Sequence, residues 1–400
     1  MINKKAVSLV LVLAVLCLSL CGCETYNNFK AAFIDPPEVK TVVKVGIFEP
    51  LTGTDAAAAK DEVLGMEIAH DLYPELENVK IDLVYGDSQS DVETSKQAAQ
   101  SLADQGVSLV LGSYGSVYSL AGGDVFKEIG IPAIAATNKN PILTKTNDYY
   151  FRVAAVEAYQ GSSVAYFVHD YFKNESATVF MKENDDYAIS MAELFESTLK
   201  ELTGNEDCVV TIKYPEDTED FTQYFNMVSL AKNHTIFFPG DAASGDQIIK
   251  AAYEQGFTDF AWIGTSRWDG IDSVSEGSTE YLSGVSYVMD YDEDELITPM
   301  TAVFKQAYAE KLQKEDVPSN AAALGFDAYL LALRAIAAAE DPLDRESIKN
   351  ALYAIEDAEG ATGYITINSI GDPYKEVVFE RYINGEFSVV YTAPITGGEE

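Results

Sequence analysis

From residue 41 onward, short runs of β-branched and aromatic residues alternate with longer amphipathic segments. The short runs have the length of strands, and the longer segments repeat their apolar positions with a helical period. The first three strand and helix pairs fall at residues 41–48 and 60–72, 79–85 and 91–105, and 108–112 and 116–130. Successive βαβ units build a parallel sheet covered by helices, so the pattern predicts an α/β fold.

The same rhythm resumes after residue 153 and predicts a second sheet of the same kind. Its strands are expected at residues 177–180, 209–212 and 235–238, and its helices at 160–170, 187–203, 221–231 and 246–255. Three consecutive helices are expected next, at residues 299–313, 320–339 and 345–353. Residues 363–391 then alternate like antiparallel strands around an Asn384-Gly385 turn, so the end of the chain returns to sheets already begun.

The first residues have the layout of a secretory signal peptide. Lys4 and Lys5 precede an apolar run at residues 6–20, which is too short to span a bilayer comfortably. The run ends in Leu20-Cys21-Gly22-Cys23, which resembles the bacterial lipobox, where the signal is cut and the cysteine is acylated. An uncleaved anchor or an ordinary secretory signal is the alternative, but all the cysteines except Cys208 cluster in this segment.

We therefore expect a lipoprotein signal peptide at residues 1–22, a lipidated Cys23, and a tether at residues 23–40. Cys208 cannot form an internal disulfide alone, so the fold must be held by its core. The chain has 400 residues, 47% of them hydrophobic, which is ample for two domains. The net charge of −37 becomes −39 when two lysines leave with the signal, and such a surface repels nucleic acid and anionic lipid headgroups.

Between residues 41 and 391, a series of short motifs resembles the type I periplasmic binding proteins, in particular the branched-chain amino acid binding group of ABC importers. The landmarks, in order, are Glu49-Pro50-Leu51-Thr52-Gly53, Gly86-Asp87-Ser88-Gln89-Ser90-Asp91, Gly112 through Ser116, Asn140-Pro141-Ile142-Leu143-Thr144, Tyr150-Phe151-Arg152-Val153, Asp186-Tyr187, Gly325-Phe326-Asp327-Ala328 and Thr362-Gly363-Tyr364-Ile365. Each motif is weak alone, and the ordered set is strong. The resemblance implies two Rossmann-like lobes of parallel sheet, joined by three crossover strands, with a ligand in the cleft.

Mapped onto this chain, the resemblance implies that lobe 1 comprises residues 41–156 and 287–374. Lobe 2 would comprise residues 157–286 and 375–394, followed by a tail at 395–400. Loops that leave the carboxyl ends of parallel strands line the ligand crevice, so the strand-to-helix junctions are the candidate site.

On lobe 1, the candidate ligand-binding residues are Ser113, Tyr114, Ser116, Thr137 and Asn138. The helix start at Ser116 suits a carboxylate, because free backbone N–H groups and the helix dipole favour an anion there. The family's carboxylate-binding serine aligns with Ser116, although a simple N-cap role is the alternative. At the next junction the register is ambiguous between Thr137 and Lys139; we choose Thr137 and expect Lys139 to extend into solvent.

On lobe 2, the candidate residues are Tyr187, Asp241, Ser266, Arg267 and Trp268. The family's ligand-touching tyrosine aligns with Tyr187, with burial at the lobe interface as the alternative. Amino acid binders normally carry an acid that holds the ligand's ammonium, and the aligned position is Ser266, followed by Arg267. An unpaired ammonium would be penalised in a closed cleft, whereas an arginine favours a second anion. The alternatives are that Asp241 supplies the missing charge or that Arg267 points away into water.

No hydrolase elbow, metalloprotease helix, dinucleotide turn or phosphate loop occurs in the chain, so we expect no enzyme activity, no cofactor and no metal site. The expected function is that of an extracytoplasmic lipoprotein, anchored to the bacterial cell membrane through its N-terminal lipid, that captures an amino acid or a related small carboxylate. Its partners would be ABC permease and ATPase subunits. The alternative is a ligand-sensing component of a signalling system with the same fold.

Overall fold

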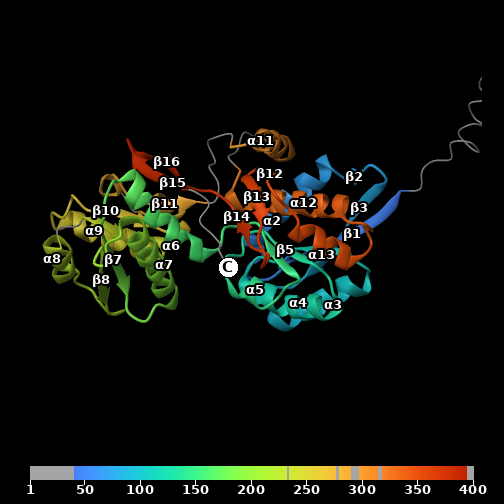
Figure 1. Cartoon of the computed structure of the whole chain (residues 1–400), viewed down its shortest axis with the longest axis horizontal. Helices are drawn as coiled ribbons and strands as arrows, with labels where there is room; N and C mark the ends of the chain where they lie inside the picture. Colours follow the sequence, from blue (N-terminus) through green and yellow to red (C-terminus); the bar gives the residue numbers. More distant parts are fainter. Residues whose placement is uncertain (1–39, 232–233, 276–278, 290–296, 314–317, 394–400) are drawn as a thin grey trace, which may run out of the picture.

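The computed structural model describes residues 40–393 except 232–233, 276–278, 290–296 and 314–317. Figure 1 shows two α/β lobes side by side, with the chain passing between them near the centre of the molecule. The expected α/β class, with two mainly parallel sheets, is confirmed. The expected signal peptide, Cys23, the tether except Lys40, and the tail at 395–400 lie outside the described residues.

Lobe 1 is built on a sheet with the strand order β2-β3-β1-β4-β5-β6, and only the β2–β3 pair is antiparallel. Its strands are β1 (Thr41–Glu49), β2 (Glu75–Leu76), β3 (Val79–Asp87), β4 (Leu109–Leu111), β5 (Ala133–Ala135) and β6 (Tyr150–Arg152). A small antiparallel sheet lies beside it, with β12 (Ala358–Gly360), β13 (Gly363–Ile367) and β14 (Pro373–Tyr374).

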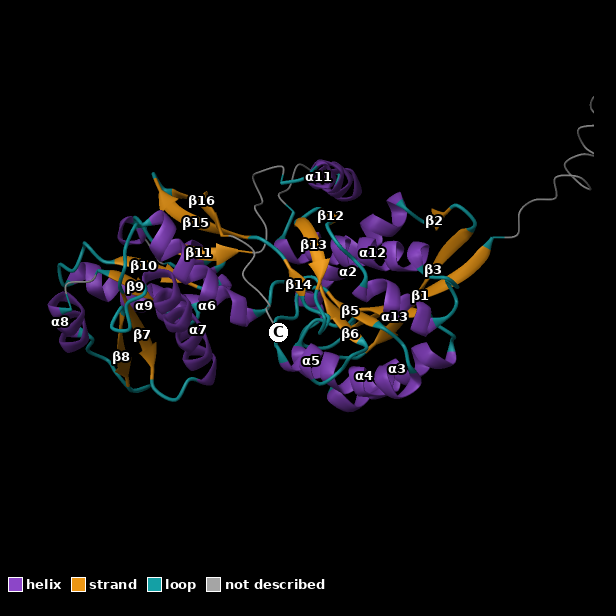
Figure 2. Cartoon of the chain, viewed as in Figure 1, coloured by secondary structure: helices purple, strands orange, loops and turns teal. Residues whose placement is uncertain are grey.

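Helices cover both faces of the lobe 1 sheet, as Figure 2 shows. They are α2 (Ala56–Leu72), α3 (Val92–Asp104), α4 (Ser116–Ile129), α5 (Ile142–Lys145), α11 (Pro299–Leu312), α12 (Asn320–Ala338) and α13 (Arg345–Tyr353). One apolar cluster packs α2 and α12 on one face, and a second packs α3 and α4 on the other. Helix α12 is long and apolar enough to cross a membrane, but most of it is buried in this core.

Lobe 2 is built on a sheet with the strand order β16-β15-β11-β10-β9-β7-β8. Its strands are β7 (Ala177–Lys182), β8 (Val209–Tyr214), β9 (Thr235–Phe237), β10 (Ala261–Gly264), β11 (Ser286–Met289), β15 (Val377–Ile383) and β16 (Glu386–Ala393). Its helical segments are α6 (Glu157–Tyr166), η2 (Phe167–Tyr171), α7 (Asp186–Thr203), α8 (Thr222–Leu230), α9 (Ala242–Glu254), η3 (Ser266–Trp268), α10 (Ile271–Val274) and η4 (Glu280–Leu282). The core strands are parallel, and β15 and β16 add antiparallel pairs at one edge.

The described elements confirm most of the expected pattern and correct some of its bounds. Helix α9, for example, begins at Ala242 and not at the expected residue 246, because Asp241 caps it there. The three consecutive helices are present, and Asn384 and Gly385 form the turn between β15 and β16. Helix α2 begins at Ala56, earlier than the expected residue 60, because four alanines extend it. The lobe boundary expected after residue 286 is wrong, because β11 pairs with β10 and β15 inside the lobe 2 sheet.

Two of the three expected crossover strands lie in the described residues, and both leave lobe 1 beside a buried polar anchor. Arg152, at the end of β6, pairs with Asp372, with Nε and Oδ1 2.6 Å apart. Lys375 lies between β14 and β15 and donates a hydrogen bond to the hydroxyl of Thr362. That hydroxyl donates in turn to the buried carboxylate of Asp327 on α12. Both crossovers are therefore fixed to the body of lobe 1.

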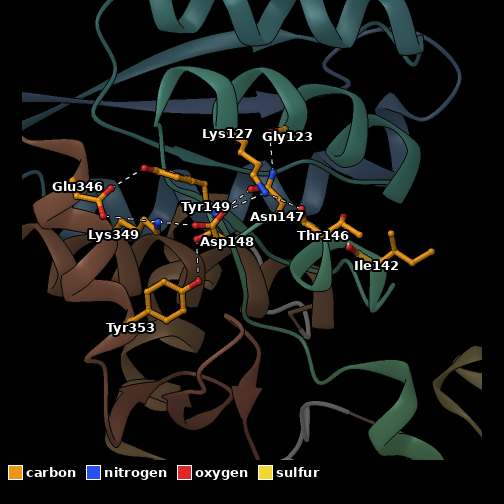
Figure 3. Close-up of polar contacts among 10 residues, drawn as sticks. All are labelled: Gly123, Lys127, Ile142, Thr146, Asn147, Asp148, Tyr149, Glu346, Lys349 and Tyr353. Atoms are coloured by element: carbon orange, nitrogen blue, oxygen red, sulfur yellow. Dashed lines mark hydrogen bonds and ion pairs between the residues drawn. The ribbon is translucent and has the colours of Figure 1, made fainter. Parts of the chain in front are cut away.

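Helix α13 is attached to the loop before β6 by polar contacts away from the strand ends that face lobe 2. Asp148 accepts from Lys349 at 2.9 Å, and Tyr149 donates to Glu346 at 2.7 Å, as Figure 3 shows. Tyr353 donates to the Asp148 carbonyl oxygen at 2.9 Å. These side chains are partly exposed, so their contacts contribute little to the stability of the fold. We infer that their main effect is to position α13.

Helices α2 and α12 approach each other at two glycines. A Cβ placed on Gly65 would lie 1.9 Å from the Ala322 carbonyl oxygen, and one on Gly325 would lie 2.2 Å from the Glu62 carbonyl oxygen. Because the obstructing atoms are backbone, no side-chain rotation could relieve the overlap. The glycines therefore set the distance between the two helices, and with it the position of Glu62.

We predict that Gly325→Ala destabilises the protein by roughly 2 kcal/mol or more, because the overlap outweighs the gain in helix propensity of about 1 kcal/mol. Urea unfolding would measure the change. Ser197→Ala, on the exposed face of α7, is the control and should change stability by less than about 0.5 kcal/mol. Equal stability of the two variants would contradict the close contact.

Candidate functional site

The candidate site lies where the strand order reverses in each sheet. In lobe 1, β3 and β4 flank β1, and in lobe 2, β8 and β9 flank β7. In parallel sheets, ligands bind outside the carboxyl ends of the strands at such points. The loops that follow β4 and β5 carry the lobe 1 candidates, and those that follow β7, β9 and β10 carry the lobe 2 candidates.

A cavity of about 330 Å³ lies at these loops. Its lining comes from both lobes: Tyr114, Gly115, Ser116, Thr137, Asn138, Lys139, Asn140 and Arg267. Five of the ten residues expected from the sequence therefore face one cavity. The volume is at the lower end of the usual range for small-molecule sites, about 300–1,000 Å³.

Ser116 is the first residue of α4, and the N-cap position is occupied by Gly115, so the N-cap alternative for this serine is wrong. The first helical bonds of α4 are made by the backbone N–H groups of Tyr118 and Ser119, which both donate to the Gly115 carbonyl oxygen. The backbone N–H groups of Ser116 and Val117 thus lie before the first hydrogen bonds within the helix. They face the end at which the helix dipole favours an anion.

A chain of hydrogen bonds joins the loops after β4 and β5. Ser116 Oγ donates to Asn138 Oδ1 at 2.9 Å, and Asn138 Nδ2 donates to Ser119 Oγ at 3.0 Å. Ser119 Oγ donates to the Ser113 carbonyl oxygen at 2.9 Å. Ser113 is fully buried and is not part of the cavity lining, and its hydroxyl donates to the Tyr114 carbonyl oxygen at 3.1 Å. A carboxylate bound at Ser116 would replace Asn138 Oδ1 as the hydroxyl's acceptor.

Two buried glutamates lie behind the lobe 1 loops. Glu49, at the end of β1, accepts from the backbone N–H of Tyr114 at 2.6 Å, and Glu62, on α2, accepts from the hydroxyl of Thr137. Both carboxyl groups are 0% exposed. Burial raises the pKa of Glu62 to about 7, and burial together with the neighbouring Glu62 raises the pKa of Glu49 well above its usual range.

Gly112 leaves room for the Glu49 carboxyl group. A Cβ at Gly112 would lie 2.6 Å from Glu49 Oε1 and 2.1 Å from the Phe48 carbonyl oxygen, and the residue has φ of +114°. Only glycine adopts this backbone conformation without strain. Glu49 and Glu62 therefore position two lining residues of the cavity. Glu49 holds the backbone N–H of Tyr114, and Glu62 holds the hydroxyl of Thr137.

Lys139 connects the lobes. Its Nζ donates to Ser266 Oγ at 2.9 Å, and the same oxygen accepts from Gln160 Nε2 at 2.8 Å. The backbone N–H of Ser266 donates to Gln160 Oε1 at 3.2 Å. The expectation that Lys139 extends into solvent is therefore wrong: its ammonium faces the opposite lobe.

Arg267 and Tyr187 form a stacked pair on lobe 2. The guanidinium carbon of Arg267 lies 3.3 Å from the centre of the Tyr187 ring, and the tyrosine hydroxyl donates to Thr265 Oγ1 at 3.0 Å. Stacking restricts the planar guanidinium while leaving its edge directed toward polar partners. Tyr187 also lines a neighbouring cavity of about 570 Å³ between the ends of β7 and β8.

The remaining lobe 2 candidates lie elsewhere. Trp268 is fully buried in the lobe 2 core, and its indole N–H donates to the Gly240 carbonyl oxygen at 3.1 Å. Asp241 is the N-cap of α9, where its carboxylate accepts from the backbone N–H of Ser244 at 2.8 Å. The structure gives both side chains local structural contacts and does not bring them to the cavity lining.

Sequence reasoning missed Glu49, Glu62, Lys139 and Gln160 as members of this region. Glu49 ends the first strand and begins the landmark Glu49-Pro50-Leu51-Thr52-Gly53, which was an available signal, whereas Glu62 lies within the helix expected at residues 60–72 and gave no signal of its burial. Gln160 gave no signal, because its contact with Ser266 spans distant segments. Among the described residues, no three His, Cys, Asp or Glu side chains are grouped so that they could hold a metal ion.

Comparisons with known proteins agree with this geometry. A model of a family described as periplasmic binding protein matches residues 42–372. The Leu/Ile/Val-binding protein homolog 2 of Brucella abortus is 25% identical over 218 residues, which is 54% of this chain and only 58% of that relative. The leucine-binding protein LivK of Thermotoga maritima is 25% identical, with a TM-score of 0.69 over 88% of this chain and 99% of that one. Streptococcus pneumoniae LivJ, solved with isoleucine, is 21% identical, with a TM-score of 0.67 over 88% and 99%.

We predict that the buried carboxyl pair makes stability fall as pH rises. The pKa of Glu62 is about 7 in the folded chain and 4.5 ordinarily, so the folded chain holds a proton that the unfolded chain releases between these values. The free energy of unfolding then decreases from about pH 4.5 to above pH 7, by at most about 1.4 kcal/mol per unit for one proton. Glu62→Gln should flatten this slope in urea unfolding at several pH values.

The control for this experiment is Glu128→Gln, because Glu128 is exposed on α4. Its pH slope should match that of the unmodified protein. A Glu62→Gln slope identical to both would show that Glu62 is ionised in the folded state.

We also predict that Lys139→Met enlarges the radius of gyration measured by solution scattering without added solute. The variant removes the donor to Ser266, and a charged hydrogen bond of about 1.5 kcal/mol corresponds to roughly a tenfold change in the ratio of open to closed lobes. Ser266→Ala should act in the same direction, while Lys96→Met, whose partner Glu93 is on the same helix, should not. An unchanged radius in both cleft variants would mean that this contact does not restrain the lobes.

Proposed function

Because the chain belongs to the periplasmic binding protein family, in its type I branched-chain amino acid group, we propose that it is an extracytoplasmic solute-binding lipoprotein of an ABC importer. Its solute is an amino acid or a related small carboxylate. The family is one of binding proteins and not of enzymes. The relatives reported above are leucine- or Leu/Ile/Val-binding proteins by description, which supports an amino acid or carboxylate class.

The single observation that carries this proposal is the cavity lined from both lobes. Lobe 1 contributes the start of α4 and the loop after β5, and lobe 2 contributes Arg267. A solute in this position touches both lobes only when they are close together. It therefore stabilises the closed form by the contacts that the open form lacks.

The proposed order of binding steps follows from the lining of the cavity, to which lobe 1 contributes more residues than lobe 2. A carboxylate first binds at the start of α4, next to Ser116 and Thr137, on loops already fixed by Glu49 and Glu62. Lobe 2 then closes and brings Arg267, stacked on Tyr187, to the solute. Hinge motion at the crossovers permits this closure, because each lobe has its own core.

The partners in this proposal are the permease and ATPase subunits of the importer, which would recognise the closed form. Lipidation of Cys23 would hold the protein at the outer face of the bacterial membrane, and residues 23–40 would separate the folded lobes from the lipid. Firm anchoring requires at least two acyl chains or a second membrane-binding signal, because one acyl chain alone gives only marginal membrane binding.

A thermal-shift screen of the purified protein tests the proposal, with amino acids, deaminated carboxylates, short dicarboxylates and small amides as the panel. A true solute at about 100 times its Kd contributes about 2.7 kcal/mol and raises the Tm by several degrees. The double variant with Ser116→Ala and Tyr187→Ala should lose the shift, and Ser197→Ala should keep it. A flat response across the panel, or an unchanged affinity in the double variant, would contradict the proposal.

A further inference from the structure

Two buried carboxyl oxygens behind the cavity lack a hydrogen-bond donor. Glu49 Oε2 accepts from the backbone N–H of Tyr114, and Glu62 Oε1 accepts from the hydroxyl of Thr137. The other oxygen of each carboxyl group, Glu49 Oε1 and Glu62 Oε2, is buried and has no donor among the described residues. Buried polar atoms without a partner are rare in folded proteins, so these two oxygens require a physical explanation.

One proton between the two carboxyl groups explains both oxygens. The side chains of Glu49 and Glu62 are in hydrogen-bond contact, which two ionised carboxylates could not make because neither would carry a donor. A carboxyl group that keeps its proton has one O–H donor. Since Glu49 Oε2 and Glu62 Oε1 already accept from other groups, the proton lies between the two remaining oxygens.

The surroundings of the pair favour this state. Both side chains are fully buried, and Gly112 lies so close that a Cβ there would be 2.6 Å from Glu49 Oε1. Burial raises the pKa of both carboxyl groups, so the pair holds a proton at a pH at which ordinary glutamates are ionised. Two carboxyl groups that share a buried site cannot both ionise easily, because their like charges repel each other.

The charged side chains of the elements packed around the pair each have contacts of their own: Asp55 before α2, Asp87 on β3, Lys139 after β5, Arg152 on β6 and Asp327 on α12. Tyr114 and Tyr150 interact with the charge of the pair. Burial, together with that charge, raises the pKa of both phenols, so both stay neutral.

We propose that Glu49 and Glu62 share one proton as a carboxyl–carboxylate pair, and that this proton keeps the hydroxyl of Thr137 directed away from the cavity. With the proton held between the two carboxyl groups, Glu62 remains an acceptor toward Thr137. Thr137 then faces the cavity through the lone pairs of its oxygen. Glu49 and Glu62 are therefore positioning residues for the lobe 1 lining, and this inference goes beyond the proposed function because it does not depend on which solute binds.

Nuclear magnetic resonance of protein with labelled glutamate carboxyl carbons tests the shared proton, and buried aspartates such as Asp327 do not contribute. At about pH 8, where ordinary glutamates are ionised, we expect one protonated carboxyl signal in the unmodified protein. Glu49→Gln and Glu62→Gln should each abolish it, because the amide N–H replaces the shared proton as donor to the remaining carboxylate. The exposed control Glu128→Gln should keep it.

Thr137→Val tests the link to the cavity. It nearly keeps the shape of the side chain and removes the donor to Glu62 Oε1. The second carboxyl group of the pair should then keep its proton to a higher pH, by about one pH unit or more, because a hydrogen bond to the charged form is lost. Thr137→Ser, which retains the hydroxyl, should restore the original titration.

A protonated signal that survives Glu62→Gln would assign the proton to Glu49 alone and overturn the sharing. A titration unchanged by Thr137→Val would overturn the link to the cavity. The absence of a protonated signal in the unmodified protein would overturn both parts, and this result requires no variant to fold. Circular dichroism melting confirms that each variant is folded, and no measurement here uses a solute, so the outcome is separate from that of the proposed function.

Discussion

The close contact between α2 and α12 determines where the lobe 1 side of the cavity lies. Backbone atoms face each other at Gly65 and Gly325, so the helices cannot shift apart or together without losing packing. This contact fixes Glu62 behind the sheet, and Glu62 fixes the hydroxyl of Thr137. The contact between α2 and α12 thus affects the position of a cavity residue, Thr137, through its hydrogen bond to Glu62. The cost is a pair of buried carboxyl groups, and burial raises the pKa of both, which favours their neutral, protonated forms.

The second constraint is at the crossovers, where the chain must be rigid on the lobe 1 side and free to bend beyond it. Arg152 and Lys375 each leave lobe 1 from a buried polar cluster. Breaking such a cluster would leave an uncompensated buried charge, at a cost of roughly 3–5 kcal/mol, so bending is expected beyond the anchors. In the proposed function, lobe 1 would keep its half of the cavity unchanged while lobe 2 moves, which would allow a solute to bind before closure.

The sequence was sufficient for the fold, and it named five of the residues that line the cavity. The hydrophobic period and the lengths of the segments predicted the βαβ units. The order of the short motifs indicated the two-lobed fold class, which placed Ser116, Thr137 and Arg267 at a common cleft. Trp268 and Asp241 were misplaced relative to the cavity because position along a loop does not reveal side-chain direction: one turned into the core and the other capped a helix. Lys139 was misjudged because its partner Ser266 is contributed by the other lobe. Contacts across lobes, and the paired burial of Glu49 and Glu62, depend on tertiary distances that no local pattern encodes.

Charge distribution links these observations to the choice of solute. The chain carries a formal net charge of −37, so its surface repels small anions at long range. Such repulsion is screened beyond about 8 Å at physiological ionic strength, whereas charges in contact within a cleft are screened much less. Charged side chains that line one small cavity, such as Lys139 and Arg267, can therefore act on a bound solute independently of the net charge of the whole molecule. At the position where the sequence predicted an altered contact, Ser266 accepts a hydrogen bond from Lys139 of the opposite lobe, and the next residue, Arg267, lines the cavity.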